Sequence, residues 1–423
     1  MTLAFDMLQT LGLSVLAFLV GIQVKSMVKI FQTYFIPAPV IGGLVFSLLI
    51  FFLHQGHLLE VKLDNSLQDF FMNLFFTCIG FTCSMAVLKK SGRLGAFLAA
   101  SIVATLLVQD LIGVSLASLL GLNPLLGLPM GSISMSGGLG SALSFGPILE
   151  EAGAVGATAI GAASATFGLV LGSLVGGPVA NRLIRKNHLQ SEGEKKLPGL
   201  FKEPETKVFT EKIIFSSVFL VLLAAFLGTY LGKILNLTGL KFPYYVGCQF
   251  SGAILRNLLD AAKEKGFLTE GSRNQSGSLK GPEGINPTRT LYFDFDMDGI
   301  DLLGKISLNL FLSMAIMNLN IKQLFNLALP MVALLLAQTI AMMAWAYWVD
   351  FNLLGKNYDA AVMAAGHCGV GLGQTPNAIA NMATIIENHG PAPVAWFLLP
   401  VVMAIAINLM NPVIITVFIR ILQ

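Results

Sequence analysis

Apolar stretches long enough to cross a lipid bilayer recur along almost the whole chain. A membrane-spanning helix needs about 20 mostly apolar residues. Only 12% of the 423 residues are Asp, Glu, Lys or Arg, whereas soluble proteins contain about 25%. We therefore predict an all-α polytopic membrane protein with about ten transmembrane helices, embedded in the lipid bilayer. The ten stretches lie at about 8–30, 38–54, 69–88, 94–121, 156–184, 213–235, 243–260, 301–320, 325–350 and 392–421.

Charge and cysteine content exclude several other classes of protein. The 26 basic and 23 acidic side chains give a net charge of +3, which is too small to indicate nucleic-acid binding. Four cysteines in a chain of this length cannot form a disulfide scaffold, and their spacing matches no zinc site. No cleavage site follows the first apolar stretch, so we expect that stretch to remain as a membrane span.

Two further apolar stretches are rich in Gly, Ser and Pro and interrupt the pattern of spans. They lie near 123–147 and near 357–383. Neither supports a continuous helix as well as its neighbours do, because glycine and proline weaken helices. Irregular backbone at membrane depth is tolerated only inside protein or beside a wet cavity. We therefore predict that each stretch forms a re-entrant hairpin.

Weak sequence matches divide the chain into two halves. A shift of 234 residues places Asn123 on Asn357 and Gly137 on Gly371. Each half then holds five spans and one hairpin. Because five is odd, the second half must enter the membrane from the opposite side. Such inverted-topology repeats are typical of secondary transporters, whose binding sites lie at broken helices near the bilayer midplane.

The domain limits and the orientation in the membrane follow from these repeats. The first repeat covers 1–184 and the second covers 213–423, with a linker at 185–212 between them. Of the 26 Lys and Arg residues, 21 lie in the linker, around the loop near 261–300, or in other segments on that side of the membrane. Basic residues accumulate on the cytoplasmic side. We therefore predict a cytoplasmic linker and loop, with both termini periplasmic.

The hairpins carry the residue types that a carboxylate substrate needs. Glycine lets a ligand approach backbone amides closely, and amides at helix starts attract anions. Hydroxyl and amide side chains add further hydrogen bonds. The alternative is that Gly and Ser here only permit close helix packing. The substrate-binding candidates are Ser134, Ser136, Gly137, Gly138, Ser141, Thr166, Gly371, Gly373, Gln374, Thr375 and Asn377.

Polar groups within the spans and hairpins are candidates for a sodium site, because each one is costly in a bilayer. Asp110 is the clearest intramembrane carboxylate. Its alternative roles are to bind sodium, to bind the amino group of a substrate, or to form a hydrogen bond with a neighbour near the outer end of a span. Asn408 and Asn411 are interpreted as hydrogen bonders between helices. The sodium-binding candidates are Gln109, Asp110, Ser132, Gln338, Gly369 and Asn381.

Two other motifs favour structural interpretations. The GxxxGxxxG run of Gly168, Gly172 and Gly176 indicates close contact between helices. His367 beside Cys368 is a pair that could act in catalysis, but no Asp or Glu stands near it in the sequence. We therefore predict that the protein is not an enzyme. An intramembrane hydrolase that uses Ser136 with His367 is the minor alternative.

Several motifs together resemble a known family. They are YFIPAPVIGG from Tyr34, GSI from Gly131 with SGG from Ser136, ATFGLVLG from Ala165 with GGPVA from Gly176, and GKNYDAA from Gly355 with AIANM from Ala378. Over nearly its whole length the chain resembles the bacterial sodium/glutamate symporters (the glutamate:sodium symporter family). The resemblance implies sodium-coupled uptake of L-glutamate across the inner membrane, with Na+ as the coupling ion. It also implies that both hairpins take part in the site, and we expect a homodimer.

The chain departs from the pattern of that family at the first hairpin. Leu139 stands where a His often follows SGG, and Ser141-Ala142 replace a Thr-Gly pair. A sodium-coupled carrier of another acidic amino acid, a dicarboxylate or citrate is therefore the alternative function. We expect sodium and substrate to bind where the hairpin tips meet. An elevator movement of the bundle carrying both hairpins is expected to give alternating access, with rocking of the halves as the other possibility.

Overall fold

The computed structural model describes residues 2–55, 60–191, 210–240, 242–264, 296–319 and 321–423. Two short strands, β1 (Thr2–Ala4) and β2 (Glu60–Lys62), pair in parallel, and the other elements are helical. The α-helices are α1 (Met7–Met27), α2 (Lys29–Thr33), α3 (Ala38–Gln55), α4 (Ser66–Phe81), α5 (Met85–Lys90), α6 (Gly92–Leu119), α7 (Ser132–Met135), α8 (Gly138–Glu151), α9 (Ala157–Asn187), α10 (Glu211–Asn236), α11 (Tyr244–Glu264), α12 (Met297–Met317), α13 (Ile321–Ala344), α14 (Phe351–Leu353), α15 (Tyr358–Leu372), α16 (Thr375–His389) and α17 (Pro393–Leu422). A 3-10 helix, η1, covers Pro124–Gly127, and a π-helix, η3, covers Trp345–Asp350.

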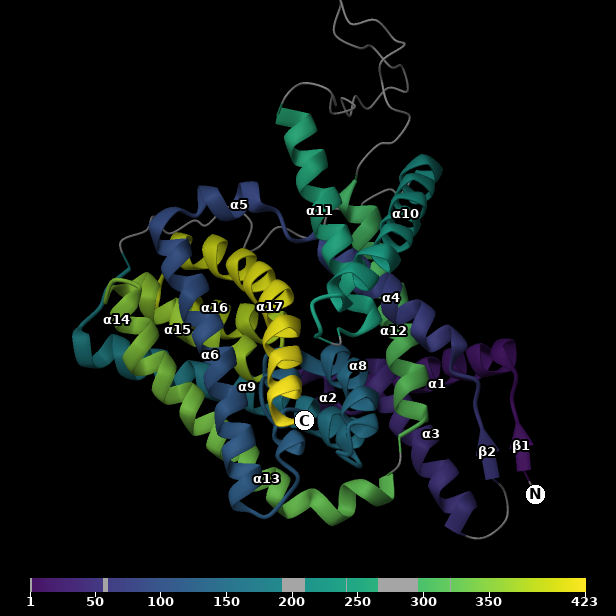
Figure 1. Ribbon diagram of the computed structural model, residues 1–423. Coiled ribbons are helices and arrows are strands. Elements are labelled where there is room, and N and C mark those ends of the chain that lie inside the picture. The colour runs from purple at the N-terminus through teal and green to yellow at the C-terminus, as the bar shows by residue number, and fades with distance from the viewer. Residues whose placement is uncertain (1, 56–59, 192–209, 241, 265–295, 320) are drawn as a thin grey trace, which may run out of the picture.

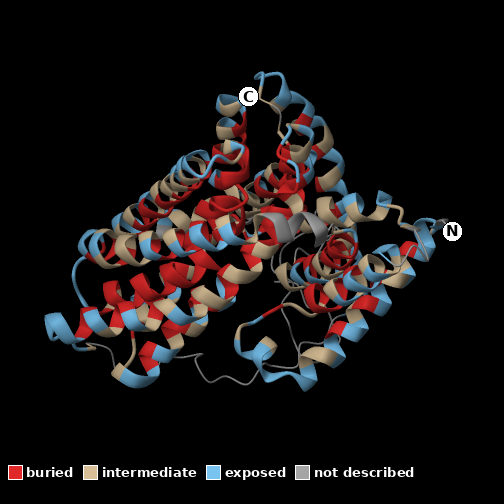
Figure 2. Cartoon of the chain, turned by 90° about the horizontal axis from the view of Figure 1, so that it is seen from below, coloured by how far each residue is buried: buried red, intermediate tan, exposed pale blue. Residues whose placement is uncertain are grey.

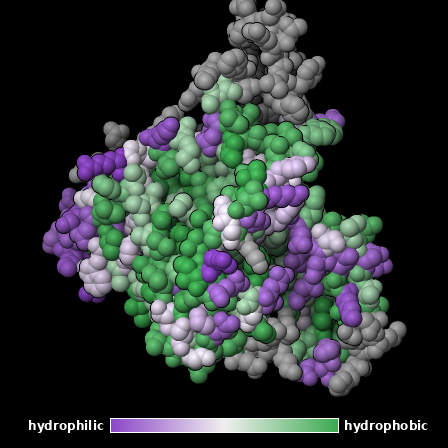
Figure 3. All heavy atoms as spheres, in the orientation of Figure 1, coloured by the Kyte–Doolittle hydropathy of each residue, from purple (hydrophilic) through white to green (hydrophobic). Residues whose placement is uncertain are grey.

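Eight helices in the described part of the chain are long and apolar enough to cross a membrane. They are α1, α3, α6, α9, α10, α12, α17 and the segment Leu327–Leu353, which contains most of α13. Apolar side chains also cover much of the face shown in Figure 3. On α10, for example, Phe215, Phe219 and Phe226 are all more than half exposed. Burying such faces in lipid tails removes them from water, so the fold is that of a helical membrane protein.

Two of the ten predicted spans are not among these eight. The stretch 69–88 is interrupted between Phe81 and Met85, so α4 has only 16 residues. A helix of that length reaches about 24 Å, which is short of the bilayer core of about 30 Å. The stretch 243–260 forms α11, which has 21 residues but carries Arg256 and Asp260. These charges lower its hydropathy below that of a continuous span.

The helices form two bundles that lie side by side (Figure 1). We call α1, α3, α4, α10, α11 and α12 the flanking bundle, and α6, α7, α8, α9, α13, α15, α16 and α17 the hairpin bundle. Buried residues lie on the facing sides of the helices, and exposed ones lie outside (Figure 2). Close approach depends on glycine. A Cβ on Gly42 of α3 would lie 1.7 Å from the carbonyl oxygen of Ala17 on α1.

Each predicted hairpin region contains two α-helices separated by a break at glycine, and the first region also contains η1. In the first region, α7 and α8 are separated at Gly137, and Gly138 has a φ of +68°, a conformation that other residues rarely adopt. In the second region, α15 ends before Gly373 and α16 begins after Gln374, whose backbone is extended. The first region also contacts the flanking bundle, because Phe145 of α8 packs edge-on against Tyr245 of α11.

Candidate functional site

The two helix breaks meet in the interior of the hairpin bundle. A Cβ on Gly138 would lie 2.7 Å from Nε2 of Gln374, so the backbone at one break touches the side chain at the other. Gln374 is partly buried, whereas Thr375 at the start of α16 is exposed. Glycine at position 138 therefore serves both the backbone turn and the close approach. The first turn of α16 begins beside this contact, and the amides of Asn377 and Ala378 there donate to the carbonyl oxygen of Gln374.

Gln109 of α6 connects both breaks through its amide group. Its Nε2 donates a hydrogen bond to the carbonyl oxygen of Gly371 at 2.5 Å, and its Oε1 accepts one from Oγ of Ser136 at 2.7 Å. Gln338 of α13 donates to the backbone oxygen of Gln109 at 2.7 Å. Oε1 of Gln338 is buried and has no hydrogen-bond partner. It is therefore an acceptor that a cation or a ligand donor could satisfy.

Asp110 is fully buried and lies against the start of α7. Its Oδ1 accepts a hydrogen bond from the backbone amide of Ser132, and its Oδ2 lies within 2.9 Å of Oγ of the same serine. Asn411 of α17 contacts Ser132 as well, with Oδ1 at 2.7 Å from Oγ and Nδ2 at 3.2 Å from the carbonyl oxygen. The predicted hydrogen-bonding role of Asn411 is confirmed, and its partner belongs to the first hairpin.

Asn377 and Asn381 of α16 join the second hairpin to α9. Nδ2 of Asn377 donates to the carbonyl oxygen of Leu169 at 2.6 Å, and Nδ2 of Asn381 donates to that of Gly172 at 2.8 Å. Oδ1 of Asn377 is buried without a partner. A Cβ on Gly373 would lie 3.1 Å from the side chain of Asn377. The structure thus places Asn377 beside the break and Asn381 in the contact with α9.

The remaining glycine and serine candidates lie within the helix contacts. Ser134 donates to the carbonyl oxygen of Gly161 at 2.9 Å, and Ser141 lies where a Cβ on Gly137 would meet its Oγ at 2.7 Å. A Cβ on Gly369 would lie 2.6 Å from the amide of Ala378, so this glycine lets α15 and α16 touch.

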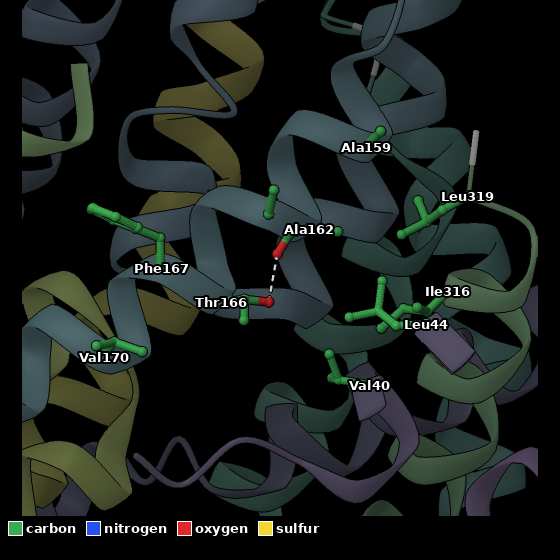
Figure 4. A pocket seen from close by; sticks show the side chains of 10 residues that line it. Val40, Leu44, Ala159, Ala162, Thr166, Phe167, Val170, Ile316 and Leu319 are labelled. Atoms are coloured by element: carbon green, nitrogen blue, oxygen red, sulfur yellow. Dashed lines mark hydrogen bonds between the residues drawn. The ribbon is translucent and has the colours of Figure 1, made fainter. Parts of the chain in front are cut away.

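Thr166 lies in the wall of an apolar cavity. The cavity measures about 380 Å³ and separates α9 from α3 and α12 (Figure 4). The Thr166 hydroxyl donates to the carbonyl oxygen of Ala162 at 2.8 Å, within its own helix. Val40, Leu44 and Ile316 face it across the cavity. This wall offers little to a carboxylate.

Sequence reasoning missed one buried polar cluster entirely. Nδ1 of His367 lies 2.7 Å from Oδ2 of Asp350, although the two residues are 17 positions apart. Ser101 of α6 donates to Oδ1 of Asp350 at 2.5 Å, and the indole of Trp345 donates to Ser101 at 2.9 Å. Both members of the pair are at most 1% exposed. The signal available in the sequence was a carboxylate at the end of the apolar stretch 325–350.

Broken helices that meet at buried polar groups inside a membrane bundle define a class of protein, the secondary transporters. The family described as Sodium/glutamate symporter matches residues 3–274 and 287–391. The chain belongs to the sodium/glutamate symporter family, as the sequence motifs predict. This is a family of transporters and not of enzymes, so the hydrolase alternative is not supported.

Individual relatives agree with the family assignment. The chain is 37% identical over 417 residues to the Sodium/glutamate symporter of Escherichia coli (strain K12). The aligned region covers 98% of this chain and 97% of the relative. The chain is 32% identical over 423 residues to the Sodium/glutamate symporter of Haemophilus influenzae (strain ATCC 51907 / DSM 11121 / KW20 / Rd), with coverages of 97% and 96%. Among solved structures, the sodium proton antiporter MjNhaP1 of Methanocaldococcus jannaschii superposes with a TM-score of 0.43 at 16% identity, over 98% of this chain and 97% of that one.

Proposed function

We propose that the protein couples the entry of sodium to the uptake of L-glutamate across the inner membrane. The observation that carries this proposal is the family match, which spans nearly the whole chain and includes both helix breaks. Moving one elementary charge across the membrane potential is worth about 2.3 kcal/mol per 100 mV. Sodium taken up in excess of the substrate charge would therefore drive accumulation. The alternative is a carrier of another acidic amino acid, a dicarboxylate or citrate.

The substrate site in this proposal lies where the two breaks meet. The backbone amides of Gly138 and Thr375, at the starts of α8 and α16, would bind carboxylates, since amides at helix starts attract anions. Ser136, Ser141 and the Gln374 side chain would add hydrogen bonds. Arg256 is not available for this role, because its Nε lies 3.0 Å from Asp260 on the same helix. Leu139, which stands in place of a family His, is fully buried in the core.

The proposed architecture contains two inverted five-span repeats, each with a re-entrant hairpin. The order of helices supports it, because α7 with α8 precedes α9 in the first half, and α15 with α16 precedes α17 in the second. In this arrangement the linker at 185–212 is cytoplasmic and both termini are periplasmic. The hairpin bundle would move against the flanking bundle as an elevator. We further propose a homodimer, which chemical cross-linking in native membranes would test.

Uptake of labelled L-glutamate into proteoliposomes tests the transport activity directly. We expect rapid uptake with an inward sodium gradient and little uptake when choline replaces sodium. Unlabelled aspartate, glutamine and citrate would be added in competition. Block by close glutamate analogues alone would support the proposal. Stronger block by citrate would assign a different substrate, and uptake independent of sodium would contradict sodium coupling.

The contact between the breaks leads to a prediction at Gly138. We expect Gly138→Ala to lower glutamate uptake about tenfold or more, because the new Cβ would displace the Gln374 side chain, and 1.4 kcal/mol is a factor of ten. The backbone strain at positive φ costs roughly 1–2 kcal/mol by itself. Gly121→Ala is the matched control, since Gly121 has a φ of +72° and no atom within 4 Å of a Cβ. Equal uptake by the two variants, measured in proteoliposomes, would show that the contact is not part of the site.

A further inference from the structure

We propose that Asp110, Ser132 and Asn411 form a sodium-binding site between the two halves of the chain. This inference rests on the proposed function, for which it names one ion site. Three side-chain oxygens from α6, α7 and α17 converge there. Oγ of Ser132 lies 2.9 Å from Oδ2 of Asp110 and 2.7 Å from Oδ1 of Asn411, and all three residues are buried.

The count of hydrogen atoms shows that these oxygens are not satisfied by one another when Asp110 is ionised. A serine hydroxyl has one hydrogen to donate, whereas an ionised carboxylate and an amide oxygen only accept. Ser132 can therefore donate to Asp110 or to Asn411, and the other acceptor faces an oxygen lone pair. Rotating the Asn411 amide by 180° does not help, because its Nδ2 already donates to the carbonyl oxygen of Ser132. A cation among the three oxygens removes this conflict.

The charge of the site points to a monovalent ion. Asp110 is 0% exposed, and none of the described basic side chains forms an ion pair with it. A buried carboxylate that is ionised needs a compensating charge. A single carboxylate with neutral oxygen ligands balances one positive charge, and hard cations such as sodium prefer oxygen ligands.

The lack of a side chain at Gly131 lets the carboxylate of Asp110 approach Ser132. A Cβ on Gly131 would lie 2.8 Å from Oδ1 of Asp110, so a larger residue at this position would push the carboxylate away from Ser132. The residue next to Asp110, Gln109, bonds to Ser136 and Gly371 at the two helix breaks. Sodium bound at Asp110 would therefore hold α7 between α6 and α17 and fix the first break before glutamate binds.

The first test measures sodium binding in the absence of glutamate. Purified full-length protein in detergent would be unfolded thermally in sodium chloride and in choline chloride, and binding of radioactive sodium would be measured in parallel. We expect sodium to raise the unfolding temperature of the wild-type protein. Asp110→Asn should lose this rise and bind sodium at least about tenfold more weakly, while unfolding in choline near the wild-type temperature. Thr416→Val is the matched control, because this buried hydroxyl of α17 bonds to the carbonyl oxygen of Pro412 in its own helix.

A charge swap provides the second test. Asp110→Asn combined with Asn411→Asp returns one carboxylate to the site, so we expect the double variant to regain sodium stabilisation. Unchanged sodium affinity in Asp110→Asn would overturn the site. A loss that the swap does not restore would also overturn it, since Asp110 would then act on the fold and not on an ion. Sodium-driven glutamate uptake by the wild-type protein reports separately on the proposed function.

Discussion

The Asp350→Ala protein is expected to unfold at a clearly lower temperature than the wild-type protein and to lose most of its uptake. The substitution leaves His367 and Ser101 buried without their shared partner. Removing one member of a buried pair typically costs about 3–5 kcal/mol. Because His367 lies in α15, one turn before Gly371, loss of the pair would also loosen the helix that ends at the second break. Thermal unfolding in detergent and uptake in proteoliposomes measure the two effects.

An exposed ion pair of the same protein supplies the control for this prediction. Asp301 and Lys305 of α12 lie 2.6 Å apart, but their side chains are 60% and 68% exposed. Exposed pairs contribute about 0–1 kcal/mol, so Asp301→Ala should barely change the unfolding temperature. Equal losses in Asp350→Ala and Asp301→Ala would mean that the buried cluster adds nothing to stability.

The same cluster shows where sequence reasoning reached its limit. The sequence offers no acidic neighbour for His367, and a catalytic partner was therefore not expected. The structure corrects the premise, because the π-helix Trp345–Asp350 brings Asp350 to the imidazole from 17 positions away. π-helical turns are rare and often occur at functional sites. Nothing in the apolar run 325–350 distinguishes such a turn from an ordinary helix, so the contact could not be predicted.

The positions of the long apolar helices could be predicted because hydropathy depends on sequence alone. The interruption of 69–88 could not, since Thr82 and Ser84 differ little from residues that helices tolerate. In the structure this interruption is bonded to α11, where Asn257 accepts from the amide of Met85 at 2.7 Å. A polar helix such as α11 is stable here because it packs against α4, with Gly80 touching the backbone of Gln249. Packing against neighbouring helices therefore stabilises α4 and α11, although neither is a long, continuously apolar helix.

The glycine-rich composition of the candidate site was visible in the sequence, but its pairings were not. Gln109 and Gly371 are 262 positions apart, and Ser132 and Asn411 are 279 positions apart. No local spacing encodes such contacts. The internal repeat indicated that the two hairpins correspond to each other, yet each is held by helices of the other half. Thr166 remains a predicted ligand residue, and its hydroxyl donates to a carbonyl oxygen of its own helix, α9.

The glycine run on α9 leads to the second large effect. Gly168, Gly172 and Gly176 face α15 and α16, as the interpretation of close helix contact requires. A Cβ on Gly168 would lie 2.0 Å from the carbonyl oxygen of Leu372, at the end of α15, and 3.0 Å from the Met135 methyl group of the first hairpin. Backbone cannot yield as a flexible side chain can, so α9 and α15 must separate. Overpacking of this kind costs about 1–3 kcal/mol.

We therefore expect Gly168→Ala to abolish most uptake, because the displaced oxygen belongs to the residue just before the second break. A misplacement of about 1 Å at a binding site can lower activity about 100-fold. Gly176→Ala, whose Cβ would meet Ala365 at 2.6 Å, should be severe as well, and Gly172→Ala, with its nearest atom at 2.9 Å, should be milder.

Gly177→Ala is the control for this series, since it lies on the same helix and has no neighbouring atom within 4 Å of a Cβ. Alanine stabilises a helix by up to about 1 kcal/mol relative to glycine, so this variant should transport normally and unfold at the same temperature or slightly higher. Uptake assays and thermal unfolding of the four variants measure the series. Normal transport by Gly168→Ala would mean that α9 and α15 do not pack through this glycine face.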